Sequence, residues 1–353
     1  MRETRWEEIV TRMKASIQDG EIKRGERLPS ETDFAKEWGI SRMTAHRVMS
    51  ELQEAGLVER RPRVGTVVSN RRRLQSVAVL LHDTRLNPQA SYLQGISQGL
   101  PLGTDLVLHD TGGLPQRESE VLSKVEERAD GIIVFPTAAP ENTAQLAQLA
   151  SRIPLVCVDR IPDGLAVDAV VTDEFESSLE GLRVLTERGH RRIAHLTNDS
   201  LHVSSVRGRL DAYLRVLSEI GELQTRWLRT LPGPVDGFQE FAERIHFILT
   251  GMMQADDPPT AVFCVHDDFM AAVLASLNRM ELTDAVEVLS INDTPTLPIF
   301  GMNHVHRIVP RTVELGKLAA GRLVALAADN GAPPETIRLR STIVPASSGH
   351  VLK

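Results

Sequence analysis

The sequence predicts a multidomain protein that combines an α+β and an α/β part: an N-terminal winged helix-turn-helix and a C-terminal body of two lobes, each a doubly wound parallel sheet. Two short helices and a basic hairpin are encoded within residues 28–66. From residue 76 onward, apolar strand-like runs alternate with helical patterns. Residues 1–75 hold 16 Lys and Arg against 12 Asp and Glu, whereas the remainder holds 24 against 35. A basic head on an acidic body favours a nucleic-acid-binding domain at the N-terminus.

The head begins with an expected helix from Trp6 to about residue 19, followed by two helices that have clear start and stop signals. Ser30 is a good N-cap for the helix that Gly39 ends, and Ser41 caps a further helix that closes at Gly56. In this last helix the buried stripe is Ala45, Val48, Met49 and Leu52. The opposite face carries Met43, His46, Arg47 and Ser50, with Arg42 at its leading end. Cations, a histidine and a hydroxyl near a helix N-terminus suit phosphates and base edges.

A basic hairpin follows the second helix of this pair. Residues 57–58 and 64–68 are expected as two short strands, with Arg60, Arg61 and Arg63 between them and Pro62 at the turn. Such a wing would reach phosphates or the minor groove while the preceding helix enters the major groove. The alternative is an ordinary amphipathic helix pair with a solvated basic face.

The stretch LPSETDFAKEWGISRMTAHRVMSELQEAGLVERRPRVGT resembles the DNA-binding domain of the GntR family of bacterial transcription factors, in particular its HutC-like branch, from about Trp6 to Val68. The resemblance implies DNA contacts at Ser30, Glu31, Ser41, Arg42, Thr44 and Gly65-Thr66. Many members have arginine where this chain has His46, which leaves the base preference there open. The full set of candidate DNA contacts is Arg27, Ser30, Glu31, Ser41, Arg42, Met43, Thr44, His46, Arg47, Arg61, Arg63, Gly65 and Thr66.

The predicted boundaries are residues 1–69 for the winged helix, 70–75 for a short polar linker and 76–353 for the two-lobed domain, with the chain crossing between lobes near residues 160, 292 and 330. Because ligands bind outside the carboxyl ends of strands in such sheets, the residues that follow strands gain weight. These positions include Asp83, Asp159 and Asp267, which are rich in hydrogen-bond acceptors. Such a set suits the hydroxyls of a sugar or a similar polar molecule, although any single one of them could be an ordinary strand-end turn or helix cap.

Several stretches of the body, among them IPLVCVDR, SSVRGRLDAYLRVL and PPTAVFCVHDDFMAAVLASL, resemble the effector domain of the LacI/GalR family, itself similar to periplasmic sugar-binding proteins. The resemblance implies effector contacts at Asp159 and Arg209. His266 stands where asparagine is frequent and Asn292 where aspartate is usual, so the effector or its pose is expected to differ. A GntR-type head on such a body is similar to the AraR-like class of sugar-responsive repressors. The candidate effector contacts are Asp83, Phe135, Asp159, Arg160, Arg209, His266, Asp267 and Asn292.

Other classes of function find little support in the sequence. The two cysteines, Cys157 and Cys264, lie in apolar runs and are expected to be reduced core residues. No signal peptide and no membrane-spanning run is visible, so a cytoplasmic protein is expected. The GHRR stretch at 189–192 is interpreted as a helix end, and His304-Val305-His306 offers too few ligands for a metal. We expect neither an enzyme nor a bound cofactor or metal.

The sequence therefore predicts a DNA-binding transcriptional regulator, a repressor, whose partners are double-stranded operator DNA, a small carbohydrate-like effector and a second copy of itself. One alternative is a regulator whose body serves only as a dimer platform. Another is a solute-binding or enzymatic α/β protein with an accessory DNA-binding head. The sequence names neither the effector nor the operator, and it leaves repression or activation, and induction or corepression, undecided.

Overall fold

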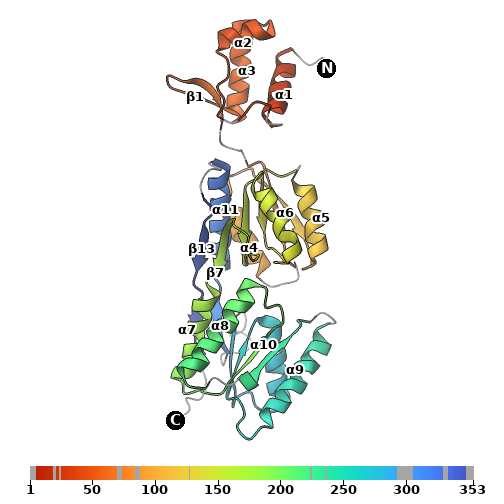
Figure 1. Ribbon diagram of the computed structural model, residues 1–353, viewed down its shortest axis with the longest axis vertical. Helices are drawn as coiled ribbons and strands as arrows, with labels where there is room; N and C mark the ends of the chain where they lie inside the picture. The colour runs from red at the N-terminus through yellow and green to blue at the C-terminus, as the bar shows by residue number, and fades with distance from the viewer. Residues whose placement is uncertain are drawn as a thin grey trace.

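The computed structural model describes residues 5–18, 21–23, 25–69, 74–83, 88–126, 128–222, 225–234, 237–291, 305–328 and 333–346. Three units follow one another along the long axis of the molecule: the N-terminal domain, a first lobe and a second lobe (Figure 1). The predicted linker at 70–75 falls largely outside the described residues, since only 74 and 75 belong to them.

The N-terminal domain has the predicted helix-turn-helix and wing. Its elements are α1 (Arg5–Gln18), α2 (Glu31–Trp38), α3 (Arg42–Glu54), β1 (Val58–Arg61) and β2 (Gly65–Val68). Ser30 accepts a hydrogen bond from the Asp33 amide, and Ser41 accepts one from Thr44, so both predicted N-caps are confirmed. Gly39 ends α2 with φ of 61°, a conformation that glycine adopts without steric cost. The apolar faces of the three helices close one small core with Val58 and Val68 of the wing.

The first lobe is a six-stranded sheet whose strands are all parallel, in the order β13-β7-β6-β5-β3-β4. The strands are β3 (Ser76–Leu81), β4 (Asp105–Asp110), β5 (Gly131–Val134), β6 (Leu155–Val158), β7 (Asp168–Thr172) and β13 (Thr336–Leu339). The helices are α4 (Gln89–Gly99), α5 (Pro115–Val125), α6 (Pro140–Ala150) and α11 (Thr312–Ala328). One face of the sheet packs against α4 and α11 and the other against α5 and α6. The central strands are buried on both faces, as continuous apolar runs predict.

The second lobe repeats this plan with one antiparallel edge strand, in the order β14-β12-β11-β10-β8-β9. Its strands are β8 (Ile193–Asn198), β9 (Leu228–Leu231), β10 (Ala261–Cys264), β11 (Glu287–Ile291), β12 (Val305–Val309) and β14 (Thr342–Val344). Its helices are α7 (Glu174–Glu187), α8 (Ser204–Glu219), α9 (Phe238–Met253) and α10 (Asp267–Arg279), with a short 3-10 turn at Thr225–Trp227. Cys157 and Cys264 are free and buried in the two lobes, as expected.

All three crossings between the lobes lie later in the chain than predicted. The first follows β7 at Asp173 and not near 160, because the strand at 168–172 still belongs to the first sheet. The second lies between β12 and α11, not near 292, because β12 completes the second sheet before α11 returns to the first lobe. The third lies at residues 340–341, because β13 pairs in the first sheet and β14 pairs in the second.

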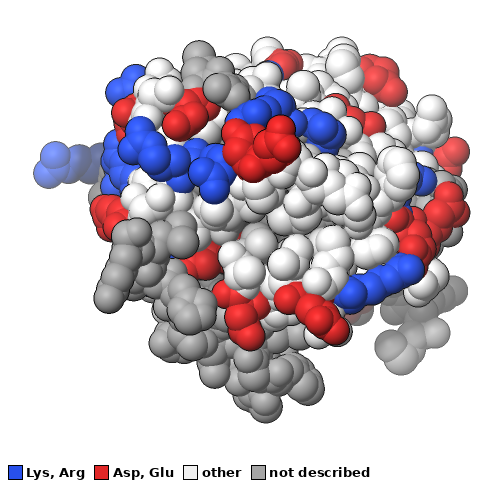
Figure 2. Space-filling model, turned by 90° about the horizontal axis from the view of Figure 1, so that it is seen from below, with Lys and Arg blue, Asp and Glu red and all other residues white. Residues whose placement is uncertain are grey.

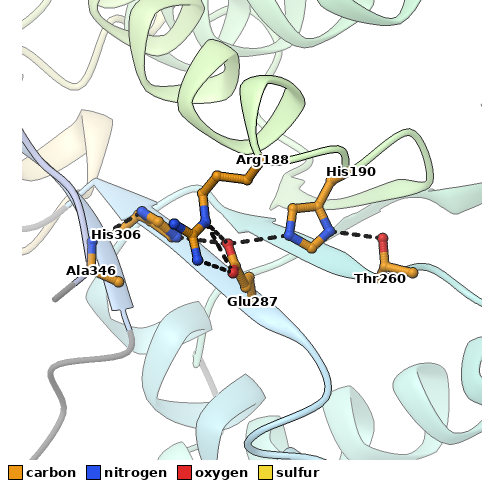
Figure 3. Close-up of polar contacts among 6 residues, drawn as sticks. All are labelled: Arg188, His190, Thr260, Glu287, His306 and Ala346. Atoms are coloured by element: carbon orange, nitrogen blue, oxygen red, sulfur yellow. Dashed lines mark hydrogen bonds and ion pairs between the residues drawn. The ribbon is translucent and has the colours of Figure 1, made fainter. Parts of the chain in front are cut away.

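The GHRR stretch does more than end a helix. Gly189 adopts φ of 96° directly after α7, which agrees with the predicted helix end. Arg188 and His190, on either side of it, both reach the Glu287 carboxylate at the start of β11, where His306 of β12 joins them (Figure 3). Fully buried His306 is thus bound to a carboxylate, and its expected neighbour His304 lies outside the described residues.

Candidate DNA-binding surface and effector site

The outward face of α3 is the candidate reading surface. Met43 exposes 83% of its side-chain surface, and Arg42, His46 and Arg47 are also exposed. The guanidinium of Arg47 lies 4.0 Å from the centroid of the Trp6 ring in α1. This cation–π contact orients Arg47 toward α1, so Arg42, Met43 and His46 are the side chains of this face that are free of such a contact in the described part of the chain.

The start of α3 offers hydroxyls and amides to an anion. Ser41 Oγ lies 2.8 Å from Thr44 Oγ1 and accepts a hydrogen bond of 3.1 Å from the Thr44 amide. Ser30 plays the same part for α2, where its hydroxyl also donates to Asp33 at 2.6 Å. The N-terminus of α3, whose first turn holds no acidic residue, suits a phosphate group because the helix dipole favours negative charge there, whereas the first turn of α2 carries Glu31 and Asp33.

The wing brings further arginines to the same domain. Contrary to the prediction that all three arginines lie between the strands, Arg60 and Arg61 belong to β1, and only Arg63 is in the turn. Arg60 donates to Glu31 at 2.6 Å, so Glu31 holds the wing against the start of α2. Arg61 pairs with Glu59 on its own strand.

The tip of the wing has an unusual backbone. Arg63 has φ of 63° and Gly65 has φ of 109°, and the left-handed conformation is costly for a residue such as arginine. Arg27 lies against this tip, because a Cβ on Gly65 would be 3.4 Å from its Nε atom. Thr66 is fixed through its carbonyl, which accepts from the Leu28 amide at 2.9 Å. The tip therefore gathers Arg27 and Arg63 around Gly65.

The end of the second lobe carries charges of both signs. Figure 2 views the molecule from the end of this lobe, and basic and acidic side chains are intermixed there. Its helices pair their arginines with carboxylates, as Arg183 and Arg215 do with Glu219.

Replacing Arg42 with alanine is expected to weaken binding to operator DNA by about 1–3 kcal/mol if Arg42 reads a base, and by less if it contacts only a phosphate. The reason is its exposed position at the leading end of α3. Fluorescence anisotropy with labelled DNA at several salt concentrations measures the effect and separates the two cases. Unchanged affinity would remove Arg42 from the interface.

The candidate effector residues converge where the carboxyl ends of the strands of the two lobes meet. Asp159 follows β6 with φ of 72°, a strained conformation for aspartate. Its carboxylate accepts from Arg160 Nε at 3.0 Å. Across the junction, Arg209 of α8 donates to the carbonyl of Val265, at the end of β10, at 2.9 Å. Asp159 and Arg209 are close enough for the carboxylate to contribute to raising the pKa of the arginine.

His266 and Asp268 come from the start of α10 in the second lobe. Burial lowers the pKa of His266 to about 3, and the positive charges of Arg209 and Arg160 contribute. The ring lies edge-on to Phe269, with centroids 4.9 Å apart. His266 is therefore neutral at pH 7 and offers one donor and one acceptor. Burial raises the pKa of Asp268, and Asp83 of the first lobe adds to the rise, which places these two carboxylates near each other.

Not every predicted effector residue is placed to touch a ligand. Phe135 is buried and packs edge-on against Tyr92, with ring centroids 5.0 Å apart, so it supports the site from the core. Asp267 is the first residue of α10. Asn292 lies outside the described residues.

The structure adds three residues that the predicted set lacks. Glu174, the first residue of α7, holds Arg209 with two hydrogen bonds of 2.8 Å. Burial raises the pKa of Tyr92, to which Asp159 and Glu174 contribute. Burial lowers the pKa of His82 to about 4, and Arg160 adds to the effect. Glu174 follows a strand in the run VVTDEFE, so the strand-end rule could have found it, whereas Tyr92 lies within a helix and gave no such signal.

Metal and membrane features are not found in the described part of the chain. Among these residues, no group of three or more His, Cys, Asp or Glu side chains is arranged to hold a metal ion. None of their helices combines the length and the apolar character that crossing a membrane requires.

Comparison with known proteins agrees with this architecture. Residues 6–68 match the family of bacterial regulatory proteins named gntR, and residues 182–348 match the periplasmic binding protein-like domain. The HTH-type transcriptional repressor PurR of Mannheimia succiniciproducens is 24% identical over 253 residues, which cover 69% of this chain and 71% of that protein.

Two further likenesses span more of the chain. The arabinose metabolism transcriptional repressor of Geobacillus stearothermophilus is 24% identical over 301 residues, covering 78% of this chain and 79% of that protein. The crystal structure of the transcription regulator CcpA of Lactococcus lactis superposes with a TM-score of 0.68 at 16% identity, covering 79% of this chain and all of that one. The chain therefore joins a gntR-type helix-turn-helix domain to a periplasmic binding protein-like domain, and its relatives are transcriptional repressors.

Proposed function

We propose that this protein is a transcriptional repressor that binds operator DNA through α3 and the wing and is controlled by a small polar effector bound between the two lobes. The observation that carries the proposal is the presence, in one chain, of an exposed cationic reading face and of a separate convergence of Asp159, Arg160, Arg209 and His266 at the lobe junction. An effector shifts DNA affinity only by its different affinities for two arrangements of the protein.

A carbohydrate or a sugar derivative suits the junction best. Among the described residues, three buried polar atoms have no hydrogen-bond partner here: Nδ1 of His82 just after β3, Oγ1 of Thr197 near the end of β8, and Oε1 of Gln89 at the start of α4. Such atoms are costly to bury unpaired, and the hydroxyls of a sugar can serve both as donors and as acceptors. The relative named for arabinose metabolism supports the same class of effector.

A homodimer is part of the proposal. One winged helix offers few base contacts, and paired heads can read two half-sites. The first lobe has an apolar edge suited to self-association. On the outer strand β4, Val107 and Leu108 expose 43% and 51% of their surface, and Leu102 and Leu114 are exposed on either side of that strand. A regulator that binds chromosomal DNA would act in the cytoplasm.

The central experiment measures binding of the purified protein to the DNA upstream of its own gene, by anisotropy, across a series of salt concentrations. Affinity should fall steeply with salt, because phosphate contacts release counterions. A parallel thermal-unfolding screen with neutral sugars should find a ligand that stabilises the protein and alters its DNA affinity. Absence of any salt-sensitive DNA binding, with every sugar tried, would contradict the proposal.

Asp159→Ala is expected to abolish the response to the sugar found in that screen while DNA affinity without sugar stays within about twofold of wild type. The carboxylate lies at the lobe junction and belongs to a different domain from α3. Anisotropy with and without sugar measures both quantities. Loss of DNA binding by a folded Asp159→Ala protein would show that the junction is wrongly assigned as the effector site.

A further inference from the structure

All three nitrogens of the Arg209 guanidinium already have a partner. Nε and Nη2 donate to the two oxygens of Glu174 at 2.8 Å each, and Nη1 donates to the Val265 carbonyl at 2.9 Å. The arginine side chain is 11% exposed and that of Glu174 is 7% exposed. A planar fork that binds a carboxylate in this bidentate way is the geometry by which arginine also recognises a phosphate or an organic acid. The protein's own carboxylate therefore fills the position that an anionic ligand would take.

The position of Glu174 is fixed by its surroundings. It is the first residue of α7, whose N-cap Asp173 accepts from the Glu176 amide. Helix α8 comes close at Gly208, where a Cβ would be 3.2 Å from the Cβ of Glu174. Burial alone would lower the pKa of Arg209. The negative charges of Glu174 and then of Asp159 outweigh this effect, so the pKa of Arg209 is raised. An anion could reach Arg209 only by displacing a buried carboxylate that is held in place on two sides.

The second cation of the junction is also neutralised. Arg160 Nη2 lies 3.0 Å from the Asp159 carboxylate, and the two side chains are 17% and 24% exposed. Asp83 and Asp268 add two more carboxylates nearby. Among the described residues, the junction thus brings together two arginines and four carboxylates, while His82 and His266 are neutral at pH 7 because burial lowers the pKa of each. The field of these groups disfavours a further negative charge.

From this geometry we infer that Glu174 is a specificity residue, which occupies Arg209 and makes the junction select uncharged polyhydroxyl effectors over phosphorylated or carboxylated ones. The inference rests on the proposed function of the junction as an effector site. A neutral hydroxyl can still bind beside the Arg209–Glu174 pair, because each charged group retains capacity for a further hydrogen bond. A phosphate would instead bring a further negative charge into a site whose arginines are already paired with carboxylates, which is electrostatically unfavourable.

The test titrates inorganic phosphate, at constant ionic strength, into the full-length wild type and into Glu174→Gln, with calorimetry and thermal unfolding as readouts. Wild type should show no saturable binding. Glu174→Gln, which keeps the size of the side chain but frees the charge of Arg209, should bind phosphate at least about tenfold more tightly than wild type. The gain should vanish in the double variant Glu174→Gln/Arg209→Gln. Glu180→Gln, the same charge change on an exposed residue of α7, should leave phosphate binding as in wild type.

Either of two results overturns the inference: a folded Glu174→Gln protein that gains no phosphate binding, or a wild-type protein whose saturable phosphate binding is lost in Arg209→Gln. Should Glu174→Gln not fold, the titration of the wild type decides. Absence of saturable phosphate binding would then support the inference, and phosphate binding that depends on Arg209 would contradict it. The phosphate readout needs no DNA. Failure of the proposed regulatory function, seen as missing salt-sensitive DNA binding, therefore remains distinct from failure of this inference.

Discussion

Alanine in place of Gly95 is expected to destabilise the first lobe by about 3 kcal/mol or more, or to prevent its folding. Helices α4 and α11 touch through their backbones at this glycine. A Cβ on Gly95 would lie 2.0 Å from the Val313 carbonyl oxygen and 2.9 Å from the Lys317 amide. Neither neighbour can yield as a side chain would, so the helices would have to separate along their shared buried face. Chemical denaturation followed by circular dichroism measures the loss.

Gly321 supplies the matched control for this prediction. It lies in α11 as well, but it is exposed, and nothing lies within 4 Å of a Cβ built on it. Gly321→Ala should therefore stabilise the protein by about 0.5–1 kcal/mol, since alanine favours a helix over glycine. Equal stability of Gly95→Ala and wild type would show that the two helices do not meet in the described way.

The contact between α4 and α11 also affects the candidate effector site. A Cβ on Gly316 would be 2.3 Å from the Tyr92 carbonyl oxygen, and the Tyr92 ring packs on Phe135 and lies near the charges of Asp159 and Glu174. Helix α11 reaches this position only after the second crossing of the chain. The backbone contact between α4 and α11 thus places Tyr92 at the junction, so a looser helix pair should also weaken the proposed response to a sugar.

The sequence was a good guide wherever structure depends on near neighbours. Ser30 and Ser41 cap the helices that they were expected to cap, and the buried stripe of α3 is the predicted one. The alternation of strands and helices in the body was also correctly predicted, because buried parallel strands appear as continuous apolar runs. The crossings were misplaced because apolar runs do not say which of two similar sheets a strand joins. Residues 168–172 and 342–344 illustrate this.

For the candidate effector site, too, the sequence predicted some residues and missed contacts that depend on tertiary packing. Asp159, Arg209 and His266 were expected at the junction from their places after strands and from resemblance, and the structure brings them together. The pairing of Arg209 with Glu174 joins residues 35 positions apart through the packing of α7 on α8, and no local pattern encodes that. The contacts of Arg60 with Glu31 and of Arg47 with Trp6 likewise depend on tertiary packing.

Glu287→Ala is expected to cost the second lobe about 3 kcal/mol at pH 7, because it leaves Arg188 without its counter-charge in a largely buried place. Arg188 donates to Glu287 from Nε and Nη2, at 2.9 and 2.7 Å, and His190 Nε2 lies 3.1 Å away (Figure 3). On the other side, the Ala346 amide donates to His306 Nδ1 at 3.1 Å. Nδ1 must therefore carry a lone pair, so the proton of neutral His306 is on Nε2 and is donated to Glu287 at 2.8 Å.

The pH dependence of this loss has a definite sign. Burial would raise the pKa of Glu287, but the hydrogen bonds from His190, His306 and Arg188 outweigh it and hold the pKa well below its usual value. A carboxyl with a lowered pKa stabilises the fold above its ordinary pKa of about 4.3 and loses this contribution as pH falls. The difference in unfolding free energy between wild type and Glu287→Gln should thus be largest near neutral pH and shrink below about pH 4.

Urea denaturation of both proteins across this pH range measures the difference. Glu219→Gln is the control, since Glu219 meets Arg183 and Arg215 at the surface and exposed pairs contribute little. A gap between wild type and Glu287→Gln that stays constant from pH 7 to pH 3 would mean that the carboxylate is not the charged centre of the network. Since His306 of β12 and Ala346, after β14, both take part in this network, its loss should loosen the β12–β14 edge of the second sheet while leaving the DNA-binding domain folded.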